Sequence, residues 1–169
     1  MATTAATDRL RVRSTSVYER FAGLCAVLAG VLTLLYSVSF ILLINEPLSS
    51  FCLLANGLLA SAVLVALYER VRAGNTSFAL WALLLGLAGA IGSVLHGGYD
   101  LAAVLQPHAA VDPNLPSAMD PRGLLTFGLT GLALALFSWL ILESGQLPER
   151  LAYLGYLVAA LQIILYLGP

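Results

Sequence analysis

Five long apolar runs constrain this sequence more than any other feature. They cover residues 21–44, 48–68, 78–96, 124–142 and 151–167. A helix that crosses the hydrocarbon core of a bilayer needs about 20 apolar residues. Backbone groups in lipid must find their hydrogen bonds within the same segment, so runs of this length predict helices. The sequence therefore predicts an all-α polytopic transmembrane helix bundle of about five spans.

The composition agrees with a lipid environment. The chain is 60% hydrophobic and 10% charged, whereas a soluble domain is about 45–50% apolar and about 25% charged. Residues 1–20 are polar, and the first apolar run is too long for the core of a secretory signal peptide. We therefore interpret residues 1–20 as a retained cytoplasmic arm and residues 21–169 as one transmembrane domain.

The arginines predict the orientation. All eight basic residues are arginine, which, with the Ala, Leu and Gly bias, hints at a GC-rich bacterial genome. With the N-terminus inside, one arginine lies outside and seven lie in the cytoplasm, a clear positive-inside bias. We expect a protein of the bacterial inner membrane, with its C-terminus and the Pro-rich loop 106–123 outside. The outer arginine is Arg122, and the inner ones are Arg9, Arg11, Arg13, Arg20, Arg70, Arg72 and Arg150.

Both histidines lie in one stretch, HGGYDLAAVLQPHAAVD, and each stands four residues before an aspartate. If the third helix continues past His96, then His96 and Asp100 share one face and lie within hydrogen-bonding reach. We expect the pair Gly97-Gly98 to break the helix there and to let backbone groups approach a partner. The depth is close to the outer interface of the membrane.

Three interpretations of this stretch are open. In the first, His96 and Asp100 tie the end of the third helix to its neighbours, as most buried polar groups are simply hydrogen-bonded. In the second, a divalent metal binds the two pairs, His96 with Asp100 and His108 with Asp112, whose ligand types suit zinc. In the third, His96 ligates or neighbours a haem or a quinone. A bis-histidine haem site is excluded within this chain, because no second histidine lies at membrane depth.

Small and amide residues predict where the helices meet. Helices pack in lipid through small residues and interhelical hydrogen bonds, and glycines recur in the third and fourth runs. We expect helix–helix polar contacts or, alternatively, a polar path for a solute. Cys25 and Cys52 fall at opposite depths, so we expect no disulfide between them. The predicted polar contacts are Asn56, Ser93, His96, Asp100 and Gln162.

Three segments carry a resemblance to a known group: YERFAGLCAVLAGVL, SFALWALLLGLAGAIGSVLHGGYDLA and DPRGLLTFGLTGLALALFSWLI. The chain resembles a family of small uncharacterised multi-span membrane proteins of GC-rich bacteria that contain HGGYD. The likeness covers most of residues 17–167. It implies a membrane fold and a further helix after the fifth, where this chain stops or is incomplete. The family has no assigned activity, so the resemblance transfers no catalytic residue.

Two classes of function follow from these features. The first is a structural or accessory subunit of a larger membrane complex of respiratory or photosynthetic type, which has other membrane subunits and the lipid bilayer as its partners. The second is a small transporter or channel that acts as a homo-oligomer. An enzyme ranks behind both, and we identify no catalytic residue. No nucleic-acid patch is present in the sequence, and no intrinsic cofactor is predicted beyond a metal or a neighbouring haem, quinone or pigment.

Overall fold

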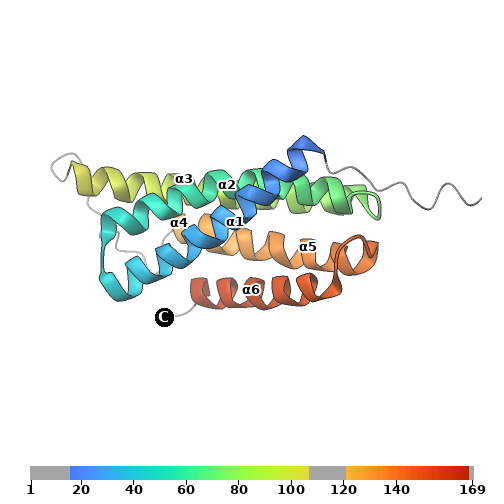
Figure 1. Ribbon diagram of the computed structural model, residues 1–169. Helices are drawn as coiled ribbons and strands as arrows, with labels where there is room; N and C mark the ends of the chain where they lie inside the picture. The colour runs from blue at the N-terminus through green and yellow to red at the C-terminus, as the bar shows by residue number, and fades with distance from the viewer. Residues whose placement is uncertain (1–15, 107–120, 168–169) are drawn as a thin grey trace, which may run out of the picture.

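A computed structural model describes residues 16–106 and 121–167, with the side chains of 121 and 165–167 left aside. All regular elements within these ranges are helical, which confirms the expected all-α fold. The elements, drawn in Figure 1, are α1 (Val17–Ser37), η2 (Val38–Leu43), α2 (Glu46–Val71), α3 (Thr76–Leu105), α4 (Pro121–Gly123), η3 (Leu124–Leu129), α5 (Thr130–Ser144) and α6 (Glu149–Leu167). The segments η2 and η3 are π-helical.

Polar residues between the apolar runs begin the helices. The Ser16 hydroxyl accepts a hydrogen bond from the backbone of Glu19 at 3.1 Å, and the Glu19 carboxylate accepts one from the backbone of Ser16 at 2.9 Å. This reciprocal cap satisfies two backbone donors and begins α1 at Val17, earlier than the apolar run that starts at residue 21. Asn45 and Asn75 cap α2 and α3 through their side-chain oxygens.

The third helix is longer than its apolar run. It continues without a break through Gly97-Gly98 to Leu105, whereas the run was expected to end near 96. A Cβ at Gly97 would lie 2.5 Å from the carbonyl oxygen of Ser50 and 2.6 Å from the backbone nitrogen of Leu54. Of the two roles expected for Gly97-Gly98, the structure therefore has close approach and not a break, because α3 comes against the backbone of α2 here.

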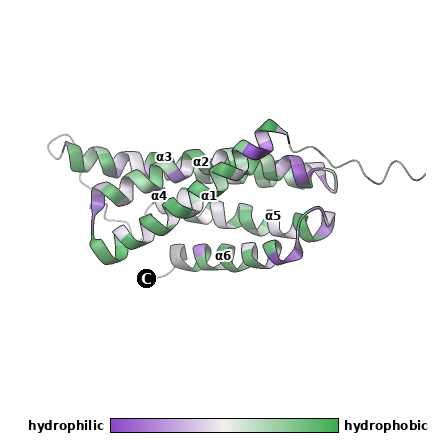
Figure 2. Ribbon diagram, viewed as in Figure 1, coloured by the Kyte–Doolittle hydropathy of each residue, from purple (hydrophilic) through white to green (hydrophobic). Residues whose placement is uncertain are grey.

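Within the described residues, four helical segments are long and apolar enough to cross a membrane: Val17–Leu43, Glu46–Val71, Thr76–Leu105 and Leu124–Ser144. Figure 2 shows hydrophobic residues along the lengths of the helices and hydrophilic ones near their ends. The chain is an integral membrane protein. The fifth run, 151–167, forms the helix α6, but it is not among the four segments that meet these criteria in the described residues. The fifth span stays a prediction.

The helices run back and forth between two ends of the bundle (Figure 1). One end, here called the arginine end, holds the start of α1 and the turns between α2 and α3 and between α5 and α6. Its described arginines are Arg20, Arg70, Arg72 and Arg150. The opposite end, here called the histidine end, holds His96, Asp100 and Arg122 together with the start of α2.

Helices α2, α3, α5 and α6 form the packed part of the bundle. α3 packs against α2 on one side and against α5 and η3 on the other, and α5 packs against α6. The predicted glycines of α3 lie in these contacts: a Cβ would come 2.7 Å from Leu64 at Gly86 and 2.6 Å from Leu125 at Gly92. A cluster of buried residues fills the arginine end, namely Val71, Ala79, Ala82, Phe137, Leu140, Ile141 and Ala152.

Helix α1 stands apart from this packed part. It packs along α2, and in the described residues it makes no comparable contact with α5 or α6. Only 6% of its most apolar window is buried, against 39% for α3 and 44% for the span that contains α5. Cys25 of α1 and Cys52 of α2 are both buried and both free. The bundle is therefore closed on the α3–α5 side and open beside α1.

Candidate functional site

The polar stretch of α3 forms a contact at the histidine end. His96 Nε2 lies 3.3 Å from Asp100 Oδ2. The two residues are four positions apart on an unbroken helix, which brings their side chains onto one face. The His96 side chain is mostly buried, with 16% of its surface exposed, while that of Asp100 is 37% exposed. The pair therefore lies at the boundary between the packed helices and their surroundings.

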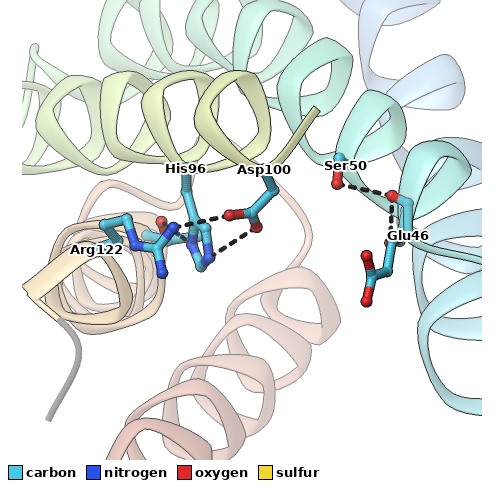
Figure 3. A network of polar contacts seen from close by, with 7 residues as sticks. Glu46, Ser50, His96, Asp100 and Arg122 are labelled. Carbon is cyan, nitrogen blue, oxygen red and sulfur yellow. Dashed lines mark hydrogen bonds and ion pairs between the residues drawn. The ribbon is translucent and has the colours of Figure 1, made fainter. Parts of the chain in front are cut away.

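Arg122 forms an ion pair with Asp100. Its Nη1 donates a hydrogen bond of 2.7 Å to Asp100 Oδ1, and Figure 3 shows Arg122 and His96 reaching the two different oxygens of the same carboxylate. The guanidinium also lies over the ring of Tyr99, 5.0 Å from its centroid, where a cation is attracted to the ring face. Asp100 therefore joins the end of α3 to the start of the next membrane span.

The other ring nitrogen of His96 contacts Thr126. The distance from His96 Nδ1 to Thr126 Oγ1 is 3.3 Å, and Thr126 is buried in the π-helical segment η3. A proton on Nε2 suits the carboxylate of Asp100, which leaves Nδ1 to accept from the Thr126 hydroxyl; this tautomer is inferred from the hydrogen-bond partners. His96, Asp100, Arg122 and Thr126 are called the histidine network below.

The sequence alone did not predict Arg122 or Thr126 as members of the site. Arg122 stood out only as the single arginine on its side of the membrane. Its pairing had one sequence signal, which is an opposite charge to Asp100 at the facing end of the next span. Thr126 had no such signal, because a π-helical turn holds more residues than an α-helical turn and changes which side chain faces the neighbour.

Only two of the four residues predicted to bind a metal, His96 and Asp100, are among the described residues. His108 and Asp112 lie outside the described residues, so the four-residue metal site of His96, Asp100, His108 and Asp112 stays a prediction. Within residues 16–106 and 121–167, no group of three or more His, Cys, Asp or Glu side chains is placed to hold a metal ion. The Arg122 cation against Asp100 competes with a metal ion for that carboxylate.

The other predicted polar contacts divide into two kinds. Ser93 is buried and donates to the carbonyl of Gly89 in its own helix at 3.1 Å. Asn56 of α2 and Gln162 of α6 make no hydrogen bond to another helix that the described residues supply. Both instead line a cavity of about 300 Å³ inside the bundle. The carbonyl oxygen of Gln162 is buried and has no hydrogen-bond partner among the described residues.

This cavity lies between the open helix α1 and the packed part of the bundle. Its walls come from α1, α2, α3, η3, α5 and α6, and none of the described residues that line it is charged. Thr126 belongs both to the cavity wall and to the histidine network. The polar residues at its surface are Thr33, Tyr36, Asn56, Ser93, Thr126, Thr130 and Gln162.

The fold and this arrangement define a polytopic helical membrane protein with a charged network at one end and an uncharged cavity within. The chain matches no family model, no curated protein and no solved structure. The resemblance based on HGGYDLA and the DPRG-led segment therefore stays a prediction.

Proposed function

We propose that this chain is an accessory subunit of a larger membrane assembly and that α1 carries the surface that docks on its partner. The observation behind this proposal is the pair Gly23 and Gly30. They lie seven residues apart, which is close to two helical turns and places them on one face. A Cβ built at either position meets no atom of the described residues within 4 Å. Glycines at such positions let a second helix approach closely.

The contrast with the other helices supports this proposal. At Gly57, Gly86, Gly97 and Gly131 the space of a Cβ is already taken by a neighbouring helix. The glycine face of α1 has the same composition without such a neighbour, and the valine and leucine beside it are exposed: Val27 by 65% and Leu34 by 69%. Lipid contact alone does not call for glycine, since larger apolar residues serve a lipid-facing helix better.

We also propose the orientation in which the arginine end faces the cytoplasm of a bacterial cell, with the C-terminus on the opposite side of the inner membrane. Four described arginines lie at that end, Arg20, Arg70, Arg72 and Arg150. The arginine of the histidine end, Arg122, is engaged with Asp100. An excess of arginine on one side of the membrane is the usual mark of the cytoplasmic face.

A double variant tests the docking surface. The protein is purified from its native membrane in mild detergent, and the mass and composition of the particle are recorded. We expect a second membrane polypeptide at a fixed ratio to the wild-type chain and its loss in Gly23→Leu/Gly30→Leu. The matched control is Leu28→Phe/Leu35→Phe, which adds bulk at exposed positions on another face of α1 and keeps the partner.

Two results would overturn the proposal. A homo-oligomer without a second polypeptide would remove the subunit role and bring forward a small transporter or channel. Retention of the partner by the glycine double variant would show that docking uses another surface.

Thiol labelling tests the orientation. In a background where Cys25 and Cys52 are replaced by alanine, one variant carries Gly74→Cys at the arginine end and the other Gln106→Cys at the histidine end. Both positions are exposed. We expect a membrane-impermeant thiol reagent added outside intact cells or spheroplasts to label the second variant and not the first. The reverse pattern would invert the topology.

A further inference from the structure

The cavity beside α1 has an unusual combination of surroundings. It is deep enough to touch six elements of the bundle, yet two of those elements, α1 and α6, do not pack against each other in the described residues. No helix–helix contact between α1 and α6 therefore closes the cavity along the side of the bundle that faces the lipid. An opening there would let a molecule dissolved in the bilayer reach the cavity without crossing the headgroup region.

Two amides from different helices line the cavity without a hydrogen-bond partner among the described residues. Asn56 reaches the cavity from α2 and Gln162 from α6, and no hydrogen bond to either side chain is found among the described residues. The oxygen of Gln162 is buried without a partner. An unpaired amide away from water carries a desolvation cost, which a ligand with a hydrogen-bonding head group removes. Tyr36 of α1 adds a hydroxyl to the same cavity.

The size of the cavity limits the occupant. A dry cavity of about 150 Å³ binds benzene, so a cavity of about 300 Å³ holds one substituted ring or a short chain with a head group. Ten residues of a partner helix, with a diameter of about 10 Å and a length of about 15 Å, fill roughly 1,200 Å³. The cavity therefore fits a small molecule and not a helix, which separates it from the docking face proposed for α1.

The charge of the cavity limits the chemistry. Among the described residues no acidic or basic side chain lines it, so an ionic ligand would lose its hydration without gaining a counter-charge from them. A hydroxyl or carbonyl oxygen on an otherwise apolar molecule suits the amides, because an amide both donates and accepts hydrogen bonds.

We propose that this cavity binds an uncharged lipid-soluble molecule that carries a hydroxyl or carbonyl head group, taken up from the bilayer and held by Asn56 and Gln162. Thr126 connects the site to His96, since its hydroxyl contacts that ring and its residue lines the cavity. Thr126 therefore makes the histidine network part of the cavity wall. Quinone-type rings and aliphatic alcohols share this chemistry.

The test uses the full chain, purified in detergent, and three probes of similar chain length. Decylubiquinone carries carbonyls on a ring, dodecanol carries a hydroxyl, and dodecylbenzene is a ring without an oxygen. Binding is followed by equilibrium dialysis with the protein's thermal midpoint as a second readout. We expect one saturable site per chain for one or both of the oxygen-bearing probes, and at least tenfold weaker binding of dodecylbenzene. Binding of decylubiquinone would indicate a quinone-type ligand, and binding of dodecanol would indicate an aliphatic alcohol.

Two variants connect binding to the cavity. Asn56→Leu/Gln162→Leu removes both amides, and Ala29→Leu fills the cavity from α1 without touching the α2–α3 contact. We expect each to weaken binding at least tenfold. Ala160→Leu is the matched control, because it adds the same atoms at an exposed position of α6 that does not line the cavity, and it leaves binding unchanged. If the amide variant does not fold, Ala29→Leu still decides the matter.

Several outcomes would overturn the proposal. Non-saturable partitioning of all three probes would show that no site exists. Equal binding by wild type and Ala29→Leu would place the site elsewhere, and equal affinity for dodecylbenzene would remove the role of the amides. None of these results depends on whether α1 docks on a partner, so failure here and failure of the subunit role are distinguishable.

Discussion

Helices α1 and α3 are both apolar membrane-length helices, but they are buried within the helix bundle to very different degrees. The most apolar window of α1 is 6% buried in the bundle, whereas that of α3 is 39% buried. Water plays no part in this difference, since lipid solvates a leucine on either helix equally well. The difference lies in the small residues, because close backbone approach is what brings helices together in lipid.

Glycine has a different setting in the two helices. At two glycines of α3 a neighbouring backbone leaves no room for a Cβ. A Cβ added at Gly92 would lie 2.9 Å from the carbonyl carbon of Leu125, and one added at Gly97 would lie 2.5 Å from the carbonyl oxygen of Ser50. At Gly23 and Gly30 of α1 that space is empty. Apolar character alone therefore places a helix in the membrane. Whether another helix of the same chain packs against it is shown by the atoms that surround its glycines.

The most severe test of this difference between α1 and α3 is a large side chain at a glycine whose Cβ space is occupied by a neighbouring helix. Gly97→Leu pushes α3 away from α2, and we expect it to destabilise the bundle by about 3 kcal/mol or more, through overpacking against a backbone that cannot move aside. Gly30→Leu is the counterpart on α1, where we expect no loss of monomer stability. Unfolding in detergent, followed by circular dichroism, measures both. Similar losses at the two positions would remove the distinction between the helices.

A core phenylalanine gives the next largest effect. Phe137 of α5 is 1% exposed within the cluster at the arginine end, while Phe40 of η2 is 61% exposed. Phe137→Ala leaves a cavity of roughly 100 Å³, and at about 24 cal/mol per Å³ the cavity term alone is about 2.4 kcal/mol. Phe40→Ala, its control, leaves no cavity and is expected to change the free energy of unfolding by less than about 0.5 kcal/mol. An equal effect of both would mean that η2 is packed more tightly than its exposure indicates.

A third prediction compares the ion pairs of the two ends. Asp100→Asn removes the charge that holds Arg122 and His96, and we expect a loss of about 1 kcal/mol, reduced from the usual value for charged hydrogen bonds because both side chains are partly exposed. Glu69→Gln breaks the exposed pair with Arg72 at the arginine end, with an expected loss below about 0.5 kcal/mol. Thermal unfolding of the two variants side by side checks the ranking. A larger loss in Glu69→Gln would contradict it.

The smallest expected effect is a gain in stability and not a loss. Gly23→Ala and Gly30→Ala add a methyl group into open space, so the gain in helix propensity is not offset by a clash. We expect each to stabilise the purified chain by less than about 1 kcal/mol. Differential scanning calorimetry in detergent measures the shift, and a destabilised variant would mean that α1 has a closer neighbour than its present surroundings show.

The sequence predicted the helices well because their signals are local. Apolar length identified the four membrane-length helices, and Asn45 and Asn75 between the runs cap two of them. The contact between His96 and Asp100 follows directly from a spacing of four residues. The remaining parts of the site depend on positions that no local pattern encodes: Arg122 meets Asp100 across a loop, and Thr126 meets His96 through a π-helical turn.

The cavity was the least predictable feature. Asn56 and Gln162 were recognised as amides that must face protein, and hydrogen bonds between helices were the simplest expectation. Their setting instead depends on how far α1 stands from α6, which is a tertiary property with no counterpart in residue spacing. The same is true of the glycine face of α1, since its composition resembles that of the packed glycine faces and only its neighbours differ.

The length of α3 couples the bundle to the thickness of the membrane that holds it. Its 30 residues span about 45 Å, well beyond a hydrocarbon core of about 30 Å, so the helix must tilt or protrude. His96 lies about 27 Å from Phe78 along this helix, close to the boundary of that core. In a bilayer of longer acyl chains the histidine network sinks and its ion pair strengthens as water withdraws; in a thinner one it emerges and weakens. We therefore expect hydrophobic mismatch to tune how firmly α3 holds the next span, an effect that unfolding in vesicles of graded acyl-chain length would record.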